Sequence, residues 1–225
     1  MTTFFESMKK FRVLWIVTLA IVAVMFIGNE NRLNREYLVY PESLDVVVAT
    51  VEGAEITLRD FAVYVAHQEA VVQKQAVIYD ATHTKRYWNV RTKQGFISHV
   101  ARNEAMWMAI HDALFYELYQ GLKMELTEEE KALIQNDADD FWSDLVDEEK
   151  DTKLGITKDD VYQTMYKIGC AQKAQMIYAG MQVVDYSDMN YSEEVFMSFL
   201  ENYEYKVNDK VLSRLDFGDI TLEHN

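Results

Sequence analysis

Leu126-Thr127-Glu128-Glu129-Glu130 joins two helical stretches of different character. Thr127 can cap the second helix with its hydroxyl, and the Glu130 side chain can accept a hydrogen bond from the amide of Thr127. Leu126 precedes the cap, in the position of a hydrophobic staple. The stretch before the joint starts near Phe96 and is rich in methionine and aromatic residues, whereas the stretch after it is strongly acidic. We therefore expect two helices that meet at this joint.

The composition predicts a mainly helical fold with a substantial core. The chain of 225 residues is 49% apolar and 13% aromatic, which is enough for one sizeable domain. Pro41 is the single proline, so none interrupts a helix after it. The β-branched residues 45–51, followed by Gly53, predict a small β element ahead of the helices. Weaker strand signals lie at residues 203–207 and 220–222.

The net charge of −15 at pH 7 argues against nucleic-acid binding, because such proteins need clustered Lys and Arg to displace counterions. Residues 125–160 carry 14 acidic and 4 lysine side chains, and we interpret their carboxylates as a solvated helix face. The one basic stretch, residues 85–93, can dock against this acidic helix or against a neighbour. Cys170 is the single cysteine and cannot form an internal disulfide, so we expect it to be a small buried apolar residue.

The segment from Val13 to Ile27, VLWIVTLAIVAVMFI, contains no charged residue and follows three basic residues. Extended from Phe11 to Gly28, it makes about 27 Å of helix against a bilayer core of roughly 30 Å. It predicts an N-terminal transmembrane helix that anchors the chain in the cell membrane. The N-terminus would be cytoplasmic and the bulk of the chain extracytoplasmic. The alternative is a signal peptide whose cleavage releases a secreted protein, although residues 26–29 form a poor cleavage site.

This interpretation divides the chain into four parts. Residues 1–28 form the cytoplasmic stub and membrane anchor, and residues 29–45 form a polar linker. Residues 46–180 form a helical domain, and residues 181–225 form a C-terminal helix and tail that pack on it. Within the domain, Thr57 and Thr157 can cap further helices, because each has an aspartate three residues downstream.

The sequence contains no motif for a metal, a cofactor or a catalytic reaction. Its histidines lack H-E-x-x-H spacing and companion cysteines, so zinc is not expected. These histidines are His67, His83, His99, His111 and His224. The acidic residues 137–144 lack the alternating ligands and the central glycine of a calcium-binding loop. The P-loop, G-x-S-x-G and G-x-G-x-x-G motifs are absent from the sequence. We therefore expect no cofactor, no metal and no catalytic residue.

Several short motifs resemble, in order, the N-terminal domain of bacterial SurA/PrsA-type chaperones. Val51-Glu52-Gly53-Ala54-Glu55-Ile56-Thr57 is similar to the V-N-G-x-x-I-T opening of that domain, with Glu52 in place of asparagine. Tyr87-Trp88-Asn89 and the joint resemble its W-N … L-T-x-E-E stretch. Gly155-Ile156-Thr157 resembles the start of its next helix. The resemblance implies an extended, helical SurA-N-like domain that binds unfolded clients.

The chain departs from this family in its C-terminal part. In the family the chaperone domain accompanies a parvulin prolyl isomerase, which carries paired histidines and a Gly-Gly loop. The 47 residues after Tyr178 contain one histidine, His224, and no Gly-Gly pair. We therefore expect no enzymatic activity, and any activity present would be peptidyl-prolyl isomerisation.

The candidate client-binding side chains lie on the methionine- and aromatic-rich stretch before the joint. They are Met106, Trp107, Met108, Phe115, Tyr116 and Tyr119. These side chains either pack in the core or line a partly exposed groove that adapts to many apolar partners. Together with the resemblance, the groove predicts a membrane-anchored, extracytoplasmic, chaperone-like protein that binds unfolded or exported polypeptides without catalysis. Two alternatives stay open, namely a cell-envelope assembly protein with one fixed protein partner and a parvulin-associated prolyl isomerase.

Overall fold

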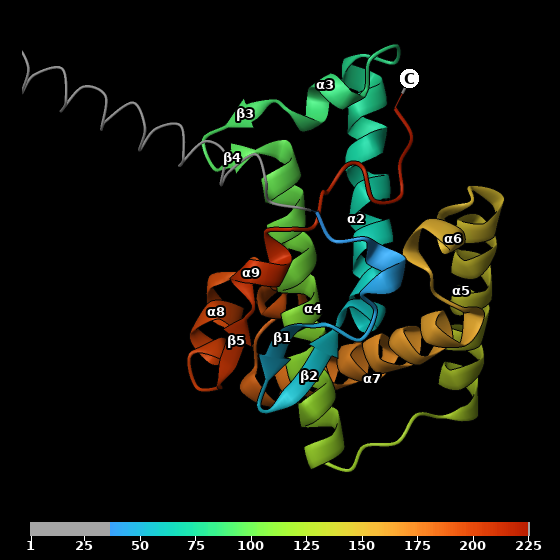
Figure 1. Cartoon of the computed structure of the whole chain (residues 1–225). Helices are drawn as coiled ribbons and strands as arrows, with labels where there is room; N and C mark the ends of the chain where they lie inside the picture. Colours follow the sequence, from blue (N-terminus) through green and yellow to red (C-terminus); the bar gives the residue numbers. More distant parts are fainter. Residues whose placement is uncertain (1–36, 225) are drawn as a thin grey trace, which may run out of the picture. The chain divides into compact units, whose positions relative to one another are not determined.

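The computed structural model describes residues 37–224, which form long helices around a small sheet (Figure 1). The helices are α2 (Leu58–Tyr79), α3 (Lys85–Trp88), α4 (Ile97–Gly121), α5 (Glu128–Asp147), α6 (Lys150–Leu154), α7 (Lys158–Gln182), α8 (Glu194–Leu200) and α9 (Asp209–Leu212). The strands are β1 (Val47–Val51), β2 (Ala54–Thr57), β3 (Arg91–Thr92), β4 (Gly95–Phe96) and β5 (Tyr205–Val207), and the 3-10 helices are η1 (Tyr40–Glu42) and η2 (Tyr186–Met189). Helix α4 packs against α7 and α2, and α5 packs against α7. The predicted helical character and the small β element are confirmed.

The prediction of a transmembrane helix is corrected. No helix within residues 37–224 is both long enough and apolar enough to cross a membrane. The long helices α2, α4 and α7 fail because each carries charged residues along its length. The predicted anchor from Val13 to Ile27 lies outside the described residues. The membrane-anchored fold class and the cell-membrane location that followed from it are therefore withdrawn.

The joint at Leu126–Glu130 has the predicted geometry. The Thr127 amide donates to Glu130 Oε2 at 2.7 Å, and the Glu130 amide donates to Thr127 Oγ1 at 3.2 Å. Leu126 is buried, as a hydrophobic staple requires. The same reciprocal cap starts α2 at Thr57 and α7 at Thr157. The sequence therefore placed the first residue of three long helices correctly.

The main sheet has the strand order β2-β1-β5, so β2 lies at one edge. Glu52 and Gly53 connect β1 to β2 with φ values of 50° and 85°, the left-handed conformation of a tight hairpin turn. On the other side of β1, the Glu52 amide donates to Glu204 O, and the Asn208 amide donates to Val48 O. Even-numbered residues of β1 therefore bond to β5, whereas Ala49 and Val51 bond to β2 as far as the register shift between Val47 and Ala49.

The C-terminal segment folds back onto α2 and is held by one buried carboxylate. Glu69 of α2 has no exposed surface. Its Oε1 accepts from the amides of Gly218 at 2.5 Å and Ile220 at 3.3 Å, and its Oε2 accepts from the Thr221 amide at 2.7 Å and the Thr221 hydroxyl at 2.5 Å. Gly218 has φ +101°, and a Cβ there would come within 2.7 Å of the Trp88 ring. The weak strand signal at residues 220–222 thus corresponds to this clamp and not to a strand.

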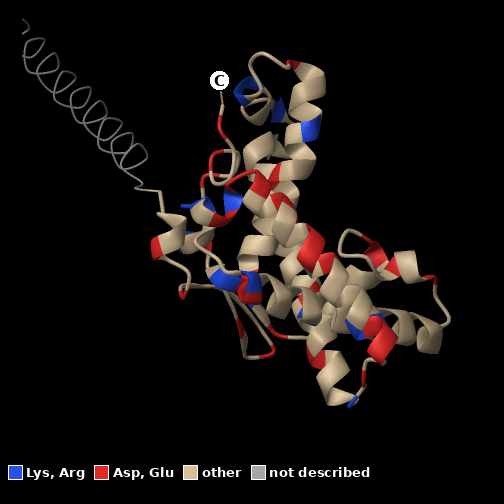
Figure 2. Ribbon diagram, turned by 90° about the vertical axis from the view of Figure 1, so that its right-hand side faces the viewer, with Lys and Arg blue, Asp and Glu red and all other residues tan. Residues whose placement is uncertain are grey.

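The segment before β1 and the basic stretch at residues 85–93 both pack within the folded part. Residues 38–45, predicted as the end of a linker, pack on the domain, and the Tyr40 hydroxyl donates to Leu58 O at 2.7 Å. The basic stretch bonds to its own surroundings, because Lys85 pairs with Asp219 at 2.8 Å and Arg86 pairs with Asp80 at 3.5 Å. The basic stretch follows the C-terminal end of α2, and Figures 1 and 2 show this end away from the acidic helix α5. Docking of the basic stretch against that helix is therefore not observed.

We predict that Glu69→Gln destabilises the protein by about 2–3 kcal/mol, because the amide NH₂ would face backbone N–H donors that lose their acceptor. Urea unfolding gives the free energy, and hydrogen exchange at the amides of Gly218 and Thr221 reports release of the segment. Glu223→Gln makes the same chemical change in the same segment at an exposed side chain and should have little effect. Equal stability of the two variants would contradict the assignment of Glu69 as the clamp.

Candidate functional site

A pocket of about 100 Å³ lies between β2, α2, α4 and α7. This volume is several times the roughly 10–15 Å³ that one water needs, so the pocket has room for one side chain. Helix α4 contributes residues at helical spacing, namely Ala109, Asp112, Ala113, Tyr116 and Glu117. These residues share one face of the helix. Ala109 and Ala113 have small side chains one turn apart, which explains why this face is hollowed.

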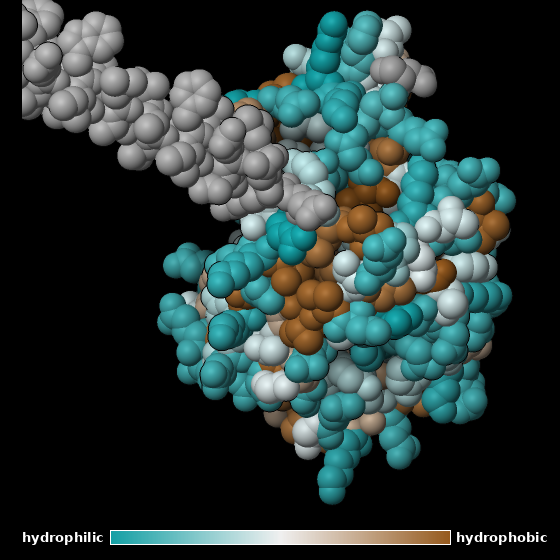
Figure 3. Space-filling view, viewed as in Figure 1, coloured by the Kyte–Doolittle hydropathy of each residue, from teal (hydrophilic) through white to brown (hydrophobic). Residues whose placement is uncertain are grey.

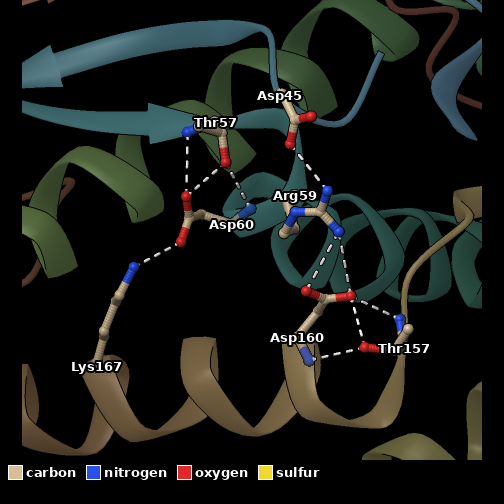
Figure 4. A network of polar contacts seen from close by, with 7 residues as sticks. All are labelled: Asp45, Thr57, Arg59, Asp60, Thr157, Asp160 and Lys167. Atoms are coloured by element: carbon tan, nitrogen blue, oxygen red, sulfur yellow. Dashed lines mark hydrogen bonds and ion pairs between the residues drawn. The ribbon is translucent and has the colours of Figure 1, made fainter. Parts of the chain in front are cut away.

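One wall of the pocket is a polar network that joins the first turn of α2 to α7 (Figure 4). Lys167 Nζ donates to Asp60 Oδ1 at 2.6 Å. The Thr57 hydroxyl and amide donate to Asp60 Oδ2 at 2.6 and 3.2 Å. Arg59 points to the other side, where it bonds to Asp45 at 2.9 Å and to Asp160 of α7 at 3.4 Å. Asp60 therefore caps its own helix and binds a second one.

The charge on Asp60 is stabilised despite its partial burial. Burial raises the pKa of Asp60. The hydrogen bonds from Lys167 and Thr57 lower it by a larger amount, so the pKa of Asp60 lies below its ordinary value. The carboxylate is therefore ionised at neutral pH, and its bonds to the cap and to Lys167 persist there.

The opposite wall holds a second anchored carboxylate, that of Asp112. The Tyr64 hydroxyl donates to Asp112 Oδ2 at 3.0 Å, and His111 Nδ1 lies 2.8 Å from Asp112 Oδ1. Burial and then the Asp112 charge raise the pKa of Tyr64 well above its ordinary value. Tyr64 thus remains a neutral hydrogen-bond donor at physiological pH and is not placed for proton transfer.

The predicted client-binding residues differ in burial. Met106, Phe115 and Tyr119 are buried, and Trp107, Met108 and Tyr116 are half-buried. Phe115 stacks on Phe199 of α8 at a ring distance of 5.6 Å. Tyr116 lines the pocket, and the other five predicted residues do not. Of the two readings that the sequence left open for this stretch, core packing therefore describes the buried residues.

Apolar surface is present elsewhere on the described part of the chain. Figure 3 shows it in the middle of the face, where the segment before β1 and the C-terminal segment run side by side. Val39 of this region is 55% exposed.

Most of the pocket residues were not predicted from the sequence, because the prediction was based on large apolar side chains and the pocket is lined mainly by small and charged ones. The available signal was the pair Ala109 and Ala113, small side chains one turn apart with the acidic Asp112 between them in sequence. The contributions from β2 and α7 depend on contacts between distant segments and leave no local pattern.

The side chains of residues 37–224 provide no clustered metal ligands. Within that range, no group of three or more His, Cys, Asp or Glu side chains is placed to hold a metal ion. Cys170 is buried as expected, and burial raises the pKa of its thiol. His111 is buried, with its second ring nitrogen 3.0 Å from Met189 O.

The chain matches no protein-family model, no curated protein and no solved structure. The resemblance to SurA/PrsA-type chaperone domains therefore stays a prediction from short motifs.

We predict that Asp60→Asn lowers the free energy of unfolding by about 2 kcal/mol at pH 7, through the loss of charged hydrogen bonds. Because the pKa of Asp60 is lowered on folding, its contribution is complete above the unfolded value near 3.9. It disappears as the pH falls through the lower folded value. Urea titrations from pH 7 to pH 3 should show the wild-type advantage shrinking below about pH 4. Asp137→Asn, on the exposed face of α5, should stay within about 0.5 kcal/mol of wild type at every pH.

Proposed function

We propose that this protein binds extended polypeptide segments without catalysis, in the manner of a chaperone, at the free edge of β2. The observation that carries the proposal is the position of the pocket directly beside that edge. Ala54, Glu55 and Ile56 of β2 all line the pocket. An added strand gains affinity from backbone hydrogen bonds, and an adjacent pocket selects one of its side chains.

The backbone of β2 presents a donor and an acceptor to an incoming strand. Glu55 lies opposite Thr50, and even-numbered residues of β1 bond to β5. The pair of Thr50 and Glu55 is therefore a non-hydrogen-bonded pair of the hairpin, and the N–H and C=O of Glu55 point outward. Glu55 is exposed, so a polypeptide can reach these groups.

Two further considerations support non-catalytic binding of polypeptides. The motifs that resemble SurA/PrsA-type domains include β2 itself, within Val51–Thr57, and the resemblance implies client binding. Asp60, the pocket carboxylate in the first turn of α2, is tied into a cap with Thr57 and an ion pair with Lys167. Prolyl isomerisation has no support in this arrangement.

The alternative of one fixed protein partner would use the same edge. Backbone pairing tolerates many sequences, whereas a fixed partner requires a particular one. Binding of several unrelated extended peptides with similar affinity would favour the chaperone-like role. Binding of a single sequence among them would favour the assembly role.

We predict that Glu55→Pro weakens peptide binding about tenfold, because loss of one outward N–H donor removes about 1.4 kcal/mol. Proline is tolerated in an edge strand when its missing N–H faces solvent, so the fold should survive. Glu55→Ala keeps the N–H and removes the carboxylate, and it should retain the backbone contribution that Glu55→Pro loses. Fluorescence anisotropy of a labelled Ser-Thr-Val-Leu-Val-Thr-Ser peptide with the full chain measures the affinities, and circular dichroism checks folding.

A second measurement does not depend on the variant. N-methylation of alternate amides in the same peptide should abolish binding for one choice of amides and spare it for the other, because only one edge of the peptide faces β2. If both methylated peptides bind as well as the parent peptide, strand addition is excluded.

A further inference from the structure

The pocket beside β2 has a strongly unequal charge. Its lining includes four carboxylates, from Glu55, Asp60, Asp112 and Glu117, and one ammonium group, from Lys167. The formal excess is therefore three negative charges. Lys167 already pairs with Asp60 at 2.6 Å, so its charge is committed to that carboxylate. Asp112 and Glu117 of α4 and Glu55 of β2 have no lysine or arginine among the other lining residues.

The Asp112 carboxylate is held ready for an additional donor. Its two oxygens each contact one neighbour, Tyr64 or His111, whereas an ionised carboxylate can accept about four hydrogen bonds. Its side chain is only 16% exposed, so a cation placed against it would be less screened than one on the open surface. Glu117 lies two turns along the same helix from Ala109 and adds a second carboxylate to this wall.

The chemistry of the lining favours an organic cation. No set of side chains in the range 37–224 is arranged to share a metal ion, so the carboxylates are too dispersed for that role. Tyr116 contributes a half-buried aromatic ring to the wall, and such rings attract ammonium and guanidinium groups. The small side chains of Ala109 and Ala113 leave space for an aliphatic stem.

We infer that the pocket selects extended segments that place an arginine or lysine side chain beside β2. The strand supplies backbone hydrogen bonds, and the carboxylates of Asp112 and Glu117 bind the cationic head. Arginine binds more tightly than lysine because its planar fork can engage two carboxylate oxygens at once. This inference rests on the proposed function, since it names the side chain that the polypeptide-binding edge prefers.

The test compares three labelled peptides with the full-length chain by fluorescence anisotropy. They are Ser-Thr-Val-Arg-Val-Thr-Ser and its counterparts with leucine or glutamate at the centre. We expect the arginine peptide to bind about tenfold tighter than the leucine peptide and the glutamate peptide to bind most weakly, as charge pairing in a partly buried site implies. The preference should diminish between 50 and 500 mM NaCl, where ion pairs are screened.

Paired variants distinguish the pocket from the general negative charge of the protein. Asp112→Asn with Glu117→Gln removes the two carboxylates that bind the cationic head and should reduce the arginine preference by about fivefold, with the leucine peptide unaffected. Glu125→Gln with Glu129→Gln changes the net charge equally at exposed residues outside the pocket, and the preference should persist.

The outcomes separate the arginine preference of the pocket from the proposed polypeptide binding at β2. Equal affinity for the arginine and leucine peptides would overturn the inference and leave the proposed polypeptide binding in place. Absence of binding by all three peptides would overturn both. An arginine preference that survives in the pocket double variant, or that disappears in the control double variant, would show that the cation binds elsewhere.

Discussion

In the capping boxes of α2, α5 and α7, the carboxylate of the third helical residue also bonds to a neighbouring helix and so holds the helices together. Glu130 caps α5 and also accepts from Lys173 of α7 at 2.7 Å. Asp60 caps α2 and binds Lys167 of α7. Asp160 caps α7 and accepts from Arg59 of α2. A cap satisfies amides that would otherwise lack partners at the start of a helix. Here the same carboxylates also fix where the neighbouring helix lies.

The pocket is a consequence of this arrangement. Cross-links between the starts of α2 and α7 set the separation of the two helices on either side of α4. The alanines of α4 leave that separation unfilled at one level, and β2 closes it from the side. The binding site therefore consists of ordinary structural residues, and the ion pair of Asp60 with Lys167 serves both the fold and the wall of the pocket.

A structural feature could be predicted from the sequence when the residues that form it lie close together along the chain. Caps act within four residues, so Thr57, Thr127 and Thr157 could be recognised from local spacing. The role of Phe115 could not be predicted in this way, because its partners Tyr178 and Phe199 lie far along the chain. The burial of Glu69 could not be predicted for the same reason. A carboxylate on a helix is expected to face solvent unless its hydrogen-bond donors, which here lie far along the chain, are known. The pocket combines both problems, because its lining comes from four elements that are distant in sequence and its space is left by the small side chains of Ala109 and Ala113.

The sheet has a consequence for the order in which the protein can fold during synthesis. β1 pairs with β5 across the chain, and 152 residues separate Glu52 from Glu204. A nascent chain therefore carries β1 with an unpaired edge until Tyr205–Val207 has left the ribosome. Contacts of such long range slow folding and leave apolar strand surface exposed in the meantime. The domain cannot close before β5 has been synthesised, and termination ahead of Tyr205 would leave a hairpin prone to aggregation.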